Sequence, residues 1–191
     1  MSGEKMLELD PFQRASLYAS ILAFFMKLAG MERIPPEITA FFESLGVELP
    51  EFDGEDLEQA ASYVRMFRAS VVRLDVSPQA RAQLPFHVKS FMEGAGYTAA
   101  APFDGIISMT GFAARLAIDA YAAHLEDREK ALKLERMIHR FNKTHLIPML
   151  ANARPRNQKL REALQRIARL VEEDSGMLLK QLTGAENHQR S

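Results

Sequence analysis

The sequence contains no cysteine among its 191 residues. This absence excludes a disulfide framework, a zinc site with thiolate ligands, an iron–sulfur cluster and a cysteine nucleophile. It also fits a reducing compartment. The N-terminal stretch lacks a basic segment followed by an apolar one, so we expect no secretory signal and predict a cytoplasmic protein.

Catalytic and cofactor motifs are missing as well. There is no GxxxxGK[ST] phosphate loop, and no GxGxxG that follows a predicted strand. No GxSxG nucleophile turn occurs. HExxH is absent, and so are the paired ExxH motifs of di-iron bundles. The sequence therefore predicts no catalytic residue and no metal ligand, identifies no cofactor, and favours a protein that is not an enzyme.

Strand patterns are also scarce, and nearly every periodic segment indicates a helix. Asp10 followed by Pro11 is typical of a helix start, and Gly184 is expected to end the last helix. Pro85 is expected to break or kink the helix that contains it. We predict an all-α fold, a single-domain bundle of six or seven helices over residues 1–184 with a long C-terminal helix and a frayed tail at 185–191.

The stretch GIISMTGFAARLAIDAYAAHL, residues 105–125, is nearly long enough to cross a bilayer. Arg115 and Asp119 lie in its interior, and no basic or aromatic belt flanks it, so we predict no membrane span. Its apolar circumference is typical of a central helix. Two interpretations of the charge pair stay open: an edge or structural pair, or a buried pair in a functional pocket.

His145 shares the apolar face of its predicted helix with Phe141. One interpretation is a core histidine that binds a backbone carbonyl group. The other is an axial ligand of a haem-like cofactor in a pocket of the bundle. The candidate ligand-binding residues are Arg115, Asp119, Phe141 and His145.

Charge is distributed unevenly along the chain. Residues 1–76 contain 7 Lys and Arg against 13 Asp and Glu, whereas residues 126–191 contain 14 against 9. Between residues 136 and 169 a single acid, Glu162, accompanies nine basic residues. Such a basic region suits an anionic partner, although it is also compatible with a solvated face or a surface docked on the acidic first third. The candidate residues for binding an anion or a partner are Arg136, Arg140, Lys143, Arg154, Arg156, Lys159 and Arg161.

The last helix has an apolar seam at nearly heptad spacing, with Asp174 at the position that the seam skips. Such a seam suits packing against a helix of another protein or of a second copy. The leading hypothesis is therefore a helical interaction protein without enzymatic activity: an adaptor, a chaperone or a small subunit of a larger assembly. The alternatives are a bundle that binds an apolar ligand or a haem-like cofactor, and a nucleic-acid-binding accessory subunit that uses residues 136–169.

Overall fold

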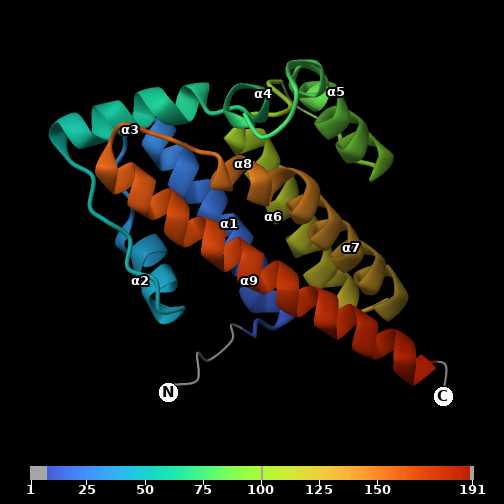
Figure 1. The fold of residues 1–191 in the computed structure, drawn as a ribbon. Coiled ribbons are helices and arrows are strands. Elements are labelled where there is room, and N and C mark those ends of the chain that lie inside the picture. The colour runs from blue at the N-terminus through green and yellow to red at the C-terminus, as the bar shows by residue number, and fades with distance from the viewer. Residues whose placement is uncertain (1–7, 100, 190–191) are drawn as a thin grey trace, which may run out of the picture.

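The structure, a computed structural model, describes the backbone of residues 8–99 and 101–189 and the side chains as far as residue 184. Four long helices form the bundle (Figure 1). They are α1 (Pro11–Ala29), α6 (Ile106–His124), α7 (Arg128–Phe141) and α9 (Gln158–Gln189). Helix α6 packs against both α1 and α7, and α9 packs against α7. The predicted all-α fold with a long last helix is confirmed.

The remaining described elements connect and cover this bundle. They are α2 (Pro36–Ser44), α3 (Gly54–Met66), α4 (Ala69–Val72), α5 (Pro78–Gly94), the π-helix η1 (Asn142–Leu146) and α8 (Ile147–Ala151). Helices α2 and α3 pack on α1, and α8 packs on α9. Within the described residues there is no strand, only an isolated bridge between Arg68 and Gly105.

The predicted start of α1 is confirmed in detail. The Asp10 side chain accepts a hydrogen bond from the backbone N–H of Gln13, and the Gln13 side chain accepts one from the backbone N–H of Asp10. This reciprocal pair satisfies two N–H groups that a helix start leaves without partners. Pro11 occupies the first turn, where a missing N–H costs nothing.

Other predicted boundaries are wrong. The apolar spacing of residues 55–74 favours one continuous helix, but the helix is interrupted at Phe67, which is extended. Pro85 lies inside α5 without ending it. Helix α9 begins at Gln158 and continues past Gly184, because glycine is tolerated inside a helix at a modest cost.

The interruption at Phe67 has a tertiary cause. The carboxylate of Asp104 accepts hydrogen bonds from the Arg68 guanidinium and from the backbone N–H of Ser70. The Ile106 N–H donates to the carbonyl of Phe67. These contacts tie the start of α4 to the start of α6, a link between distant segments that local periodicity does not contain.

Helix α6 is the one described helix that is long and apolar enough to cross a membrane by length and composition. More than half of that apolar window is buried inside the fold, where α6 packs between α1 and α7. The Leu22 side chain of α1 lies against Gly111. The predicted central position of α6 is confirmed. Burial between α1 and α7 accounts for its apolar composition, so the structure gives no clear membrane span.

The seam of α9 packs inside its own chain. Its six apolar residues are all buried in the common core: Leu160, Leu164, Ile167, Val171, Leu178 and Leu182. The seam therefore faces this chain's own helices, and it no longer supports a helix of another molecule as its partner. The skipped position, Asp174, is buried as well.

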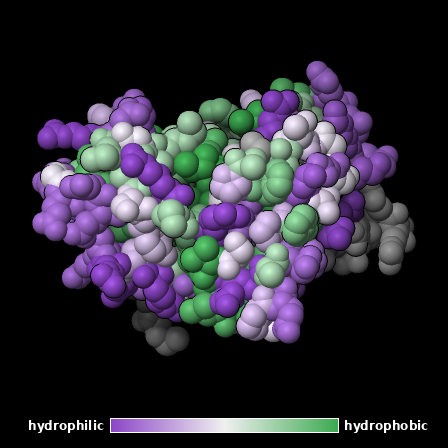
Figure 2. Space-filling model, turned by 90° about the horizontal axis from the view of Figure 1, so that it is seen from above, coloured by the Kyte–Doolittle hydropathy of each residue, from purple (hydrophilic) through white to green (hydrophobic). Residues whose placement is uncertain are grey.

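The face formed by α3, α4 and α5 is patchy. Figure 2 shows hydrophobic residues along the middle of this face, interrupted by hydrophilic ones and flanked by hydrophilic ends. Four large apolar side chains of these elements and their connections are exposed: Met66, Val71, Leu74 and Phe86. Single exposed apolar residues of this kind are ordinary on protein surfaces.

Candidate anion-binding site

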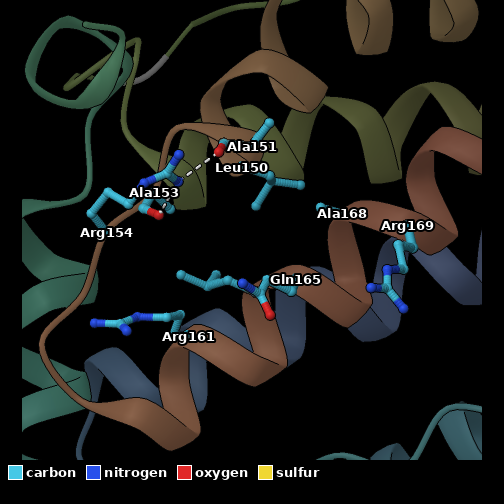
Figure 3. Close-up of a pocket in the computed structure, with 9 residues that line it drawn as sticks. Leu150, Ala151, Ala153, Arg154, Arg161, Gln165, Ala168 and Arg169 are labelled. Atoms are coloured by element: carbon cyan, nitrogen blue, oxygen red, sulfur yellow. Dashed lines mark hydrogen bonds between the residues drawn. The ribbon is translucent and has the colours of Figure 1, made fainter.

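A cleft of about 620 Å³ lies between α8, the turn that follows it and the first half of α9. Arg154 stands on the turn, and Arg161, Gln165 and Arg169 stand along α9 (Figure 3). The three α9 residues are spaced by four, which places them on one face of the helix. All four side chains are exposed. We call these residues and the hollow between them the arginine cleft.

The floor of the arginine cleft is apolar. Leu150 and Leu164 are almost completely buried beneath it, and Ala153 and Ala168 complete it. These residues belong to the core or pack against it, so the floor is rigidly supported. The cleft therefore combines charged walls with an apolar base.

Local hydrogen bonds orient two of the arginines. The Arg154 Nη1 donates to the carbonyl oxygens of Ala151, at 2.7 Å, and Ala153, at 2.8 Å. This contact places a cation at the C-terminal end of α8, where free carbonyl groups favour it. The Arg161 Nη2 donates to the carbonyl of Pro155 at 2.9 Å. Each guanidinium has five N–H donors, so both retain donors for a ligand.

Two further hollows continue the arginine cleft along the surface. One, of about 580 Å³, lies against α3 and shares Arg154 with the cleft; its lining includes Tyr63 and Arg156. The Tyr63 hydroxyl accepts a hydrogen bond from the Arg154 backbone N–H, and burial raises the pKa of this phenol. The other, of about 450 Å³, shares Arg169 and is lined by residues 45–48 of the loop after α2. Arginines thus separate three hollows in a row.

The arginines of this row lack acidic partners. Within the described part of the chain, no carboxylate lies within ion-pair distance of Arg154, Arg156, Arg161 or Arg169. Positive charge on this surface is therefore available to an anion in solution.

Lys159 differs from its neighbours. Its Nζ lies 2.6 Å from an Asp56 carboxylate oxygen and 3.8 Å from one of Asp53. The hydrogen bond with Asp56 raises the lysine pKa, and the same contact lowers the pKa of Asp56. For this residue, docking on the acidic first third is the correct interpretation.

The rest of the predicted basic set lies elsewhere. Arg136 and Arg140 are on α7 and Lys143 is on η1, and none of the three lines the arginine cleft. Arg140 and Lys143 are exposed, whereas Arg136 is half-buried and has an interaction partner. The structure thus distributes the predicted anion-binding residues over α7, η1, the turn before α9 and α9 itself.

Arg115 and Asp119 form a surface pair. Their side chains are 65% and 26% exposed, and the Arg115 Nε lies 3.0 Å from an Asp119 carboxylate oxygen. The Tyr97 hydroxyl donates to the same carboxylate at 2.6 Å, and burial together with Asp119 raises the pKa of that phenol. The pair borders a surface hollow of about 670 Å³. Of the two interpretations, the edge pair is the one that the geometry matches.

Phe141 and His145 are packed into the core, and Phe112 lies between them and Tyr97. The His145 ring lies 5.4 Å from the Phe141 ring and 5.9 Å from the Phe91 ring, centroid to centroid. Phe112 contacts both Phe141 and Tyr97, so it separates this histidine from the Arg115–Asp119 pair. The four predicted ligand-binding residues therefore do not form one site.

His145 does not bind a backbone carbonyl through Nδ1. That atom is buried and has no hydrogen-bond partner within the described residues. Burial, followed by the charges of Arg73 and His87, lowers the pKa of His145 to about 4, so the ring is neutral at pH 7. The rings of Phe91 and Phe141 occupy the space beside it.

The core contains a buried ionic network that was not predicted from the sequence. Arg14 of α1 is 2% exposed, and its Nε donates to the Asp174 carboxylate of α9 at 2.8 Å. Its Nη1 lies 3.4 Å from Glu135 of α7, which also contacts His124 at 2.9 Å. Tyr18 donates to the second oxygen of Asp174 at 3.0 Å.

This network has a signal in the sequence. Arg14, Tyr18 and Ile21 share one face of α1, so Arg14 belongs to an apolar stripe, just as Asp174 interrupts the seam of α9. Two charges that interrupt apolar faces suggest a pair, but only the fold shows that they meet. Burial raises the pKa of Asp174, and Arg14 and Tyr18 oppose that rise.

Comparison of the sequence with known protein families and with curated proteins gives no match. The arginine cleft is therefore the candidate site on the strength of its own geometry.

Proposed function

We propose that this protein is a helical interaction protein that binds an acidic segment of another protein in the arginine cleft. The supporting observation is the row of arginines without acidic partners, set over an apolar floor formed by Leu150 and Leu164. A guanidinium matches a carboxylate with two parallel hydrogen bonds. The floor would take an apolar side chain between the acidic ones, as in recognition of a peptide in a groove.

The dimensions of the site favour a peptide over a nucleic acid. Each hollow has the volume of a few side chains, and the arginines separate the hollows. No aromatic ring lines the arginine cleft, and Tyr63 is the one aromatic residue of the adjoining hollow. Proteins that bind single strands stack bases on several such rings. Nucleic acid remains the second candidate, because unpaired arginines also suit phosphate groups.

The test uses defined probes and fluorescence anisotropy. One probe is a fluorescein-labelled peptide that alternates Glu with Leu, and its matched control has Gln in place of each Glu. A labelled DNA duplex of mixed sequence is the third. We expect the Glu peptide to bind at low salt and the Gln peptide not to bind. A duplex that binds more tightly than the peptide, with an affinity that falls steeply with salt, would replace this function with nucleic-acid binding.

The double variant Arg161→Ala/Arg169→Ala should lower the affinity for the Glu peptide at least about tenfold, because hydrogen bonds to charged groups contribute about 1.5–3 kcal/mol each. Lys159→Ala is the matched control. It removes a positive charge from the same helix, but one that Asp56 already neutralises, so affinity should change little. Equal losses in the two variants would show a general charge effect and contradict a defined cleft.

A further inference from the structure

The loop before α3 and the first turn of that helix carry a dense group of acidic residues. Residues 51–56 are Glu-Phe-Asp-Gly-Glu-Asp, with four acids and no base. Phe52 is 5% exposed, and its ring lies 6.1 Å from that of Phe24 in α1, centroid to centroid. Glu51 and Asp53, on either side of Phe52, are exposed. A buried aromatic side chain thus anchors this segment, which we call the acidic loop, and leaves the flanking carboxylates at the surface.

The acidic loop reaches the beginning of α9. One oxygen of the Asp56 carboxylate lies 2.6 Å from the Lys159 Nζ, and the other accepts a hydrogen bond of 2.6 Å from the Asn157 side chain. An Asp53 carboxylate oxygen lies 3.8 Å from the same Nζ. Asn157 lines the hollow that shares Arg154 with the arginine cleft. The acidic loop therefore neutralises a lysine at the α3 end of the row of hollows.

The acidic loop resembles the ligand proposed for the arginine cleft. Its Glu-Phe-Asp sequence alternates acidic side chains with an apolar one, and the loop already places a carboxylate on a cation of α9. An acidic partner that extends along the row toward α3 would approach the same lysine and would meet Asp53 and Asp56 there. Like charges at that distance repel each other, so the loop and the partner oppose each other at one cation.

We infer that the acidic loop is an intramolecular competitor of the acidic partner: it occupies Lys159 and limits the binding site at the α3 end of the row. This inference rests on the proposed function of the arginine cleft and concerns the regulation of that site. Lys159 is the cation that the partner gains when the carboxylates of the loop are displaced or removed.

The ion pair between the loop and α9 is weak enough to be exchanged. The side chains of Lys159 and Asp56 are 41% and 33% exposed. Exposed ion pairs contribute little to stability and are screened by salt, so a carboxylate of a partner can replace Asp56 at a small cost. The pair of Arg14 and Asp174 is buried, and its partners cannot be exchanged without desolvation of a new charge. The surface position of the loop pair therefore suits a competitor.

The anisotropy assay with the labelled Glu peptide tests this inference on the full chain. Asp56→Asn removes the charge but keeps a carbonyl oxygen that can accept the Asn157 hydrogen bond. We expect it to lower the dissociation constant about two- to fivefold at low salt, the range of an exposed ion pair. Glu55→Gln is the matched control. It removes the same charge from an exposed side chain that bonds Gln59 instead of Lys159, so affinity should change little.

A second variant shows whether the gain in affinity passes through the lysine. Adding Lys159→Ala to Asp56→Asn should abolish the gain, because no cation is then released. If Asp56→Asn binds the Glu peptide no more tightly than the wild type, the inference is wrong while the proposed function stands. The same conclusion holds if Glu55→Gln or the double variant shows an equal gain. If neither the wild type nor Asp56→Asn binds the Glu peptide, both the function and the inference are overturned. Circular dichroism confirms in each case that the variant is folded.

Discussion

Arg14 in the core and Arg169 in the arginine cleft show two different uses of the same side chain. Arg14 is 2% exposed, and its guanidinium contacts the carboxylates of Asp174 and Glu135. Arg169 is exposed and has no acidic partner in the described chain. A buried charge must be matched inside the fold, because desolvation otherwise costs several kcal/mol. An exposed charge is solvated by water, so the fold does not need to match it and it can serve binding.

The largest effect is expected from breaking the buried network on one side. Asp174→Leu leaves the Arg14 charge buried with its main partner removed, so the free energy of unfolding should fall by about 3–5 kcal/mol. Urea denaturation measures this change. The double variant Arg14→Met/Asp174→Leu removes both charges and should recover most of the loss. A single variant as stable as the wild type would show that the network contributes little.

A second prediction concerns pH. The pKa of His145 falls to about 4 in the folded protein from an ordinary value of 6.5, so the neutral ring stabilises the fold above pH 6.5. This contribution, of the order of 3 kcal/mol, is lost as the pH falls from 6.5 through 4. The raised pKa of Asp174 has the opposite effect on the pH dependence of stability. It is present in both the wild type and the His145→Phe variant compared below.

Thermal unfolding of the wild type and of His145→Phe at several pH values tests this prediction. The difference in stability between the two proteins should shift in favour of the variant below pH 6.5. Parallel curves from pH 7 to pH 4 would show that His145 does not titrate differently on folding.

A smaller effect is expected at the Arg115–Asp119 pair. The ion pair is exposed and contributes little, but Asp119 also accepts the hydrogen bond of the half-buried Tyr97 hydroxyl. Arg115→Met/Asp119→Leu should therefore fold, with a decrease in melting temperature of about 2–4 °C from the lost hydrogen bond. Adding Tyr97→Phe should restore part of that decrease. A variant that fails to fold would place this pair with the buried network instead.

The smallest effect is expected in the arginine cleft. Arg169→Ala removes an exposed side chain without a partner, so the melting temperature should change by no more than about 1–2 °C. The same substitution is expected to weaken binding of the acidic peptide. A variant that loses both stability and binding would mean that Arg169 has a structural role, and the contrast with Arg14 would disappear.

Much of the fold was predictable because local chemistry decides it. The Asp10 cap, the central position of α6 and the apolar seam of α9 all follow from residue types at helical spacing. The break at Phe67 was not predictable, because Asp104 causes it from another part of the chain. Of the predicted break or kink at Pro85, the break is wrong, because α5 continues through this residue.

The candidate site was predictable only in part. The sequence indicated Arg154, Arg156, Lys159 and Arg161 as candidates for binding an anion. The structure places the three arginines along the same row of hollows, whereas Lys159 pairs with Asp56. The sequence did not indicate Arg169 as part of the cleft, although a spacing of eight from Arg161 was a usable signal. It also joined His145 and Arg115 in one set of ligand-binding candidates, whereas Phe112 and its neighbours lie between them.

The sequence by itself determined the all-α class, the helix faces and the excess of positive charge after residue 126, because each depends on residue types and their spacing. Only the tertiary structure decided which charges are neutralised. Lys159 meets Asp56 and Arg14 meets Asp174 across more than a hundred residues of chain, while Arg161, two residues from Lys159, meets no carboxylate among the described residues. Electrostatic attraction depends on distance in space, and that distance exists only once the chain has folded.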